Sequence, residues 1–85
     1  MGLDAVELVV EIEKVFKISI PNDAAAAIIT VEDFYNVVEK YVEGRGYYTR
    51  ADIEKTIKYI IAEFTGIPLD KITPDKHLCE DLGLD

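Results

Sequence analysis

The sequence predicts an all-α fold, and three features of its 85 residues support this class. Apolar residues recur with the helical period in three segments, 3–16, 31–42 and 51–64. Two of these segments follow a capping signal, in which Thr30 or Thr49 is followed three residues later by an aspartate. The chain shows no alternation of apolar and polar residues of the kind that is typical of a half-buried strand. We therefore expect a small bundle of helices.

Segment 3–16, LDAVELVVEIEKVF, is predicted to be a helix that packs on more than one side. At about 100° per residue, apolar side chains cover most of its circumference, and Glu13 falls inside this apolar arc. The remaining narrow stripe consists of Asp4, Glu7, Glu11 and Lys14. A helix this apolar is typical of a bundle. We expect it to end before Pro21, which follows an extended stretch.

The other helices are bounded by capping and stop signals. The alanine-rich segment 22–29 is expected to form one or two turns, with Asn22 or Asp23 as its N-terminal cap. Gly44 and Gly66 are expected to stop the two later helices. The buried stripe of the helix at 51–64 is predicted to be Ile53, Ile57, Ile60, Ile61 and Phe64.

From Ile67 to its last residue the chain has no sustained period, and we predict a long loop. Loops of this length are usually functional or disordered, and the apolar residues spaced along this one favour order. The expected anchors are Ile67, Leu69, Ile72 and Leu78. Cys79 is expected to line the inner face of the loop, and His77 to lie at the surface. Neither has neighbouring residues that would make a metal site or a catalytic site.

Composition excludes several classes of function. With 17 acidic and 9 basic residues, the net charge is −8, which argues against binding to nucleic acid and suits partners with basic patches. A single cysteine is compatible with a reducing, cytoplasmic setting. No apolar stretch approaches the roughly 18 residues of a membrane span, and the start lacks the features of a signal peptide. The absence of a nucleophile–base pair or a metal cluster favours a protein that is not an enzyme.

EDLGLD at the end of the sequence, and LDAVELVVEIEKVF and ISIP at its beginning, resemble motifs of acyl carrier proteins, but in a different order. In that family an Asp-Leu-Gly-x-Asp-Ser-Leu run opens the second helix of a four-helix bundle, and its serine carries 4′-phosphopantetheine. Here EDLGLD ends the sequence at Asp85, whereas LDAVELVVEIEKVF and the ISIP that follows it stand at its beginning. Residues 50–85 match the family's first helix and first loop, residues 3–43 match its second to fourth helices, and residues 44–49 would be a bridging linker.

The resemblance implies one acyl-carrier-like domain over residues 1–85, a circularly permuted bundle that we interpret as engineered. The alternative is a stretch of a tandem array, in which halves from two molecules pair. A monomer is favoured over a dimer with exchanged halves. The helix at 53–64 should then run antiparallel to that at 3–16, with Asp85 and Gly2 close together.

The resemblance also implies that the attachment serine is absent. Its place would be at Gly2, between Asp85 and Leu3, and Ser19 lacks the family's Asp-Ser-Leu context. The chain is therefore expected to carry no cofactor. Enzymes of fatty acid or polyketide synthesis with basic patches, and a phosphopantetheinyl transferase, are the partners of the parent family.

Site residues follow from the resemblance alone. The acidic residues that match the family's partner-binding positions are Asp4, Glu7, Glu13 and Asp85; Lys14 departs from that pattern. The expected acyl pocket consists of Leu8, Ile12, Phe16, Ile20, Ala25, Ile28, Ile60 and Leu78. The alternative function is a cofactor-free, acidic helical module that docks on basic partners.

Overall fold

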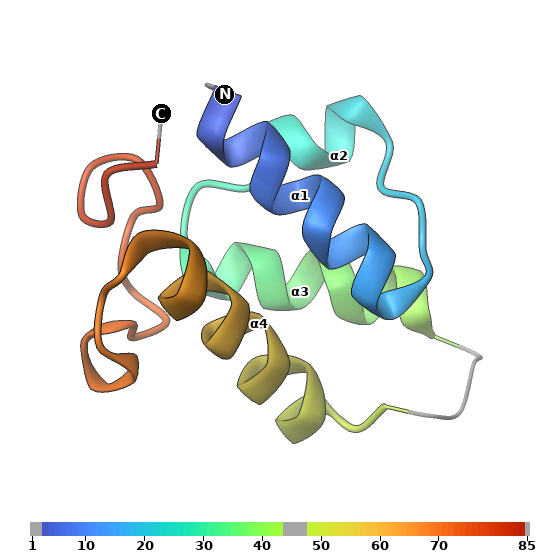
Figure 1. Cartoon of the computed structure of the whole chain (residues 1–85). Helices are drawn as coiled ribbons and strands as arrows, with labels where there is room; N and C mark the ends of the chain where they lie inside the picture. Colours follow the sequence, from blue (N-terminus) through green and yellow to red (C-terminus); the bar gives the residue numbers. More distant parts are fainter. Residues whose placement is uncertain (1–2, 44–47, 85) are drawn as a thin grey trace.

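The structure, a computed structural model, describes residues 3–43 and 48–84. Within these ranges the chain forms four α-helices and one short 3₁₀-helix, and no strand (Figure 1). The elements are α1 (Leu3–Phe16), α2 (Asn22–Ala26), α3 (Val31–Val42), α4 (Arg50–Thr65) and η1 (Leu69–Lys71). The predicted all-α class is therefore confirmed for the described residues. In this part of the chain, every helix is too short or too polar to span a bilayer.

Helices α1, α3 and α4 enclose one core. As predicted, α1 and α4 run in opposite directions, and α3 packs against α4 (Figure 1). The most deeply buried side chains are apolar or aromatic: Leu8, Ile12, Phe16, Val31, Phe34, Tyr35, Val38, Ile53, Ile57, Ile61 and Ile72. Full burial of one such side chain stabilises a fold by about 1.5–3 kcal/mol, so packing alone can hold this domain.

Both predicted capping boxes are present. At the start of α3, the Thr30 hydroxyl accepts a hydrogen bond from the Asp33 amide at 3.1 Å, and the Asp33 carboxylate accepts one from the Thr30 amide at 3.0 Å. Thr49 and Asp52 repeat this arrangement at the start of α4. Each pair satisfies two backbone donors that a helix N-terminus would otherwise leave unpaired. Gly66 ends α4 in the left-handed region, with a φ of 78°, as predicted.

The expected cap of α2 is wrong. Pro21 occupies the cap position, and no side chain caps the helix. Asn22 and Asp23 lie inside the first turn, because the Pro21 carbonyl already accepts the first helical bond, from the Ala25 amide at 2.9 Å. The helix ends at Ala26, and its five residues agree with the one or two turns that were expected.

The C-terminal segment is ordered by bonds to the rest of the chain. Its backbone pairs with residues on either side of the start of α3: the Leu78 amide donates to the Ile29 carbonyl at 2.9 Å, and the Val31 amide donates to the Lys76 carbonyl at 3.0 Å. Ile72 and Leu78 are buried, as predicted, and Ile67 is partly buried.

Several expectations for apolar positions are wrong. Leu69 is 45% exposed and lies in η1, a short turn with no buried residue, where the sequence predicts irregular loop. Phe64 is 37% exposed, since it borders an open groove beside α4. Cys79, which was expected on the inner face of the segment, is exposed, although it also borders a small gap beside α1. The buried positions there are Leu82 and Leu84, which were not predicted.

Candidate functional site

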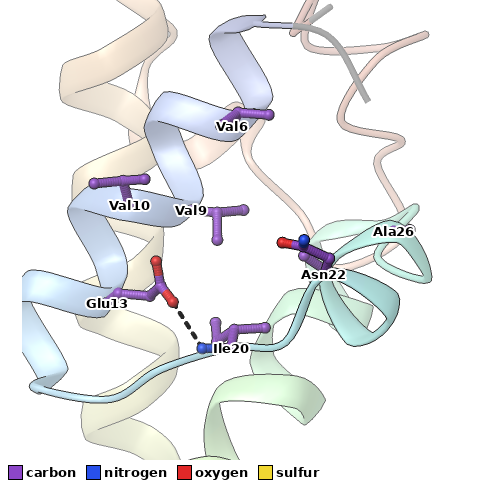
Figure 2. Close-up of a pocket in the computed structure, with 8 residues that line it drawn as sticks. Val6, Val9, Val10, Glu13, Ile20, Asn22 and Ala26 are labelled. Carbon is purple, nitrogen blue, oxygen red and sulfur yellow. Dashed lines mark hydrogen bonds between the residues drawn. The ribbon is translucent and has the colours of Figure 1, made fainter.

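An open cavity of about 320 Å³ lies between α1 and α2 (Figure 2). Its walls come from α1, from the extended chain that leaves α1, and from α2. The lining residues are Val6, Val9, Val10, Glu13, Ile20, Asn22, Ala25 and Ala26.

The geometry of α1 explains one wall. Val6, Val9, Val10 and Glu13 are spaced three and four residues apart, so they share one face of the helix. The opposite wall is α2, whose alanines have no atoms beyond Cβ to fill the space. The cavity therefore results from a valine face that is opposed by a wall of small residues.

Glu13 ties the extended chain to α1. Its carboxylate accepts a hydrogen bond from the Ile20 amide at 2.7 Å (Figure 2). The turn between them is closed by Lys17, whose φ of 56° is left-handed, and by a bond from the Ile18 amide to the Glu13 carbonyl at 3.1 Å. This is the closure with which many helices end. Glu13 thereby positions Ile20 as the far wall of the cavity.

The lining of the cavity is suited to binding an apolar ligand rather than to catalysis. Its walls are mainly aliphatic, with Glu13 and Asn22 as the polar exceptions. Pockets of this kind use a few polar groups to orient a mostly apolar ligand. In the described part of the chain, no group of three His, Cys, Asp or Glu side chains could hold a metal ion.

The predicted acyl-pocket residues are dispersed in the structure. Ile20 and Ala25 line the cavity. Leu8, Ile28 and Leu78 line a small internal gap of about 10 Å³. The other three do not line the cavity: Ile12 and Phe16 are buried in the core, and Ile60 borders a groove beside α4. The sequence reading missed Val6, Val9, Val10 and Ala26; the three- and four-residue spacing of the valines was the available signal.

The predicted acidic residues differ in their environment. Glu7 is exposed on α1, whereas Glu13 is partly buried and bonded within the chain. The side chain of Asp4, together with Gly2 and Asp85, lies outside the described residues. The expected closeness of Gly2 and Asp85 can therefore not be read from this structure.

The first turns of α1 lie beside the C-terminal segment. The small gap is lined by Ala5 and Leu8 of α1 and by Leu78 and Cys79 of the C-terminal segment. The Leu84 amide donates to the Leu78 carbonyl at 2.9 Å. The first turns of α1 and the end of the described chain therefore lie at the same end of the fold (Figure 1).

The exposed Cys79 lies in a separate hollow that also includes His77 and Glu80. The imidazole Nδ1 of His77 is 3.6 Å from a carboxylate oxygen of Glu80, and both side chains are substantially exposed. These are the features of an ordinary surface cluster. They agree with the expectation that His77 is a surface residue.

Comparison with known proteins gives a similarity over part of the chain. No protein-family model matches the chain, and no solved structure matches it. Over about half of its length, the chain is similar to an acyl carrier protein. That protein, from Karelsulcia muelleri (strain GWSS), is 42% identical over 44 residues, which are 52% of this chain and 53% of the relative. The chain thus spans about half the length of this curated relative. The similarity is to a family of carriers rather than of enzymes.

Proposed function

We propose that the chain is an acyl-carrier-like scaffold whose α1–α2 cavity shelters an apolar acyl chain. The observation that carries this proposal is the cavity itself, with a volume of about 320 Å³ between a valine face and an alanine wall. This volume is within the range of small-molecule pockets, about 300–1,000 Å³. The partial similarity to an acyl carrier protein supports the same reading.

We also propose that the bundle has the carrier fold in permuted order, with residues 50–85 as the first helix and loop and residues 3–43 as the rest. Two observations support this. Helices α1 and α4 are antiparallel, and the C-terminal segment packs against the first turns of α1. A monomer can make both contacts within one chain. A cytoplasmic setting is part of the same proposal.

The serine of the family's attachment site has no counterpart in these residues. The sequence contains one serine, Ser19, and it lies on the exposed extended chain after α1. It stands two residues before Pro21, the cap position of the five-residue helix α2, and it lacks the Asp-Ser-Leu context of the family's attachment site. In this proposal the described residues shelter an acyl chain but offer no serine in the family's context for 4′-phosphopantetheine, and we derive no covalent step for this chain.

In this proposal, enzymes of fatty acid or polyketide-type synthesis dock on the acidic residues of α1. Glu7 is exposed there, and the whole chain carries a net charge of −8. Such charges steer a basic partner most strongly at low salt. Reversal of charge by Glu7→Lys should slow association with a carrier-dependent enzyme, and the difference should shrink as salt is added. Association at the same rate at every salt concentration would contradict this role.

The competing function is an acidic interaction module without any acyl ligand. The exposure of both Glu7 and Glu11 on α1 is the observation that favours it. The two functions differ in the use of the cavity, because only a carrier needs the apolar space between α1 and α2.

A titration with free decanoyl-pantetheine, an uncharged acyl probe, tests the cavity. Amide chemical shifts of Val9, Ile20 and Ala25 should move together and saturate. Ala25→Phe, which fills the cavity, should abolish these changes, whereas Ala51→Phe on the exposed face of α4 should preserve them. If the probe leaves these amides unmoved, or if Ala25→Phe binds it as well as the parent does, the cavity does not have this role.

A further inference from the structure

A second groove, of about 350 Å³, lies between α1 and α4 and shares no residue with the α1–α2 cavity. Glu11 of α1 forms one side of it. The other side is built by four residues of α4: Tyr59, Ile60, Glu63 and Phe64.

The spacing on α4 produces two parallel rows. Tyr59 and Glu63 are four residues apart, as are Ile60 and Phe64, so each pair is stacked along the helix. Ile60 is partly buried and packs against the core. Tyr59 and Phe64 are 57% and 37% exposed. The groove therefore combines two accessible aromatic rings with an aliphatic side chain.

Carboxylates from both helices border these rings. Glu11 and Glu63 are both exposed, and neither takes part in any of the ion pairs found among the described residues. Lys14, three residues from Glu11, and Lys58, five residues from Glu63, form none of these pairs either. The apolar surface is thus bordered by negative charge that the chain itself does not neutralise.

We propose that this groove binds an arginine side chain presented by a partner protein. A guanidinium stacks on aromatic faces and forms planar bonds with carboxylates, and its stem is apolar. The rings of Tyr59 and Phe64 can pack against the apolar stem and the flat guanidinium of the arginine. Glu11 and Glu63 can pair with its positive charge. An aliphatic neighbour of that arginine would cover Ile60.

Charge complementarity favours this occupant over two others. An acyl chain would desolvate the two carboxylates without pairing them, which is costly. A second copy of the chain is less suitable, because two chains that each carry a net charge of −8 repel one another. In addition, Arg50 is already bonded to Glu39 and Glu54 of its own chain, at 3.0 and 2.7 Å. The groove therefore recognises a basic segment of a different protein. This inference does not depend on acyl carriage.

The test is a titration of the ¹⁵N-labelled full chain with the blocked peptide acetyl-Ala-Leu-Arg-Leu-Ala-amide. Saturable shift changes are expected at the amides of Glu11, Tyr59, Glu63 and Phe64. The same peptide with citrulline in place of arginine keeps the shape and removes the charge, so it should bind more weakly.

Paired variants supply the control. Glu11→Gln with Glu63→Gln should weaken binding about three- to thirtyfold, the range for the loss of two exposed ion pairs. Asp70→Asn with Glu80→Gln removes the same charge at exposed positions that do not line the groove, and should bind like the parent. Circular dichroism verifies that both variants fold.

Four outcomes would overturn the proposal: no saturable change with the arginine peptide, equal binding of the citrulline peptide, equal binding by the groove variant, or changes centred on the α1–α2 cavity. Groove shifts that depend on protein concentration without peptide would also overturn it, since they would identify a second copy as the occupant.

Discussion

The carboxylate of Glu13 and the backbone amide of Ile20 are joined by a hydrogen bond of 2.7 Å across the turn that ends α1. The bond links residues seven apart in the sequence and places Ile20 opposite the valine face of α1. The Glu13 side chain therefore both stabilises the end of α1 and holds Ile20 in the cavity wall.

Removing this carboxylate should loosen the cavity wall. Glu13→Ala leaves the partly buried Ile20 amide without its charged acceptor, so the free energy of unfolding should fall by about 1–2 kcal/mol. Glu13→Gln keeps an acceptor and should lose less. Urea denaturation followed by circular dichroism measures both. Glu11→Ala, at an exposed and unbonded position, is the control and should change stability by less than about 0.5 kcal/mol. An equally small effect for Glu13→Ala would show that the bond does not hold the turn.

The buried hydroxyl group of Tyr35 lowers the stability of the fold, because it makes no hydrogen bond. In the described part of the chain, this is the buried side-chain polar atom that lacks a hydrogen-bond partner. Tyr35→Phe removes the unpaired group and keeps the ring, which lies 5.7 Å from the Arg50 guanidinium. We expect the free energy of unfolding to rise by about 1 kcal/mol, because an unsatisfied buried group costs about 1–3 kcal/mol. A loss of stability in chemical denaturation would mean that the hydroxyl has a partner.

Tyr35→Phe should also change how the free energy of unfolding depends on pH above about 10. Burial raises the pKa of Tyr35 to about 12, above its ordinary value near 10. The unfolded chain therefore loses this proton first, and the associated stability is present below about pH 10 and is lost as the pH rises toward about 12. Tyr35→Phe should flatten the fall in stability over that range, and Tyr59→Phe, at an exposed ring, should not. Identical pH profiles for parent and Tyr35→Phe would contradict the assigned burial effect.

Asp33 should make the stability of the fold depend on pH below about 4. The hydrogen bond from the Thr30 backbone, with others from Ile29 and the Thr30 hydroxyl, lowers the pKa of Asp33 in the folded chain. The unfolded chain therefore takes up this proton first as the pH falls from about 4, the ordinary value. The stabilising contribution is present above that value and is lost as the pH falls through the lower, folded pKa.

Asp33→Asn isolates this contribution. Its urea midpoint should depend less on pH below about 4 than that of the parent, whereas Asp70→Asn, at an exposed site outside any capping box, should keep the parent's dependence. Parallel curves for the parent and Asp33→Asn would show that the capping carboxylate is not perturbed.

Local signals in the sequence predicted most of the helices. The capping pairs at Thr30 and Thr49 act within four residues, and their geometry does not depend on the rest of the fold. The bounds of α1 and the stop at Gly66 are local in the same way. This explains why these elements were predicted and confirmed.

The features that were missed depend on contacts between distant segments. Leu82 and Leu84 are buried because the C-terminal segment pairs with the residues before α3, and no period in the loop indicates that pairing. Phe64 follows the helical period of α4, but periodicity does not say where the opposing surface ends.

The candidate site was partly predictable for the same reason. Ile20 and Ala25 were expected from the family resemblance and do line the α1–α2 cavity. Val6 and Val10 were not, because their importance depends on how closely the alanines of α2 approach α1. That distance is a property of tertiary packing.

The central claim is that these residues form an acyl carrier in permuted order, and intact-mass spectrometry tests it most directly. The variant to measure has residues 50–85, then an inserted serine, then residues 3–43, and it is incubated with coenzyme A and a phosphopantetheinyl transferase. A matched variant with alanine in place of the inserted serine is the control. We expect the serine variant to gain the mass of one phosphopantetheine group, and the alanine variant and the original chain to gain none. A serine variant that is folded by circular dichroism but remains unmodified would contradict the carrier assignment.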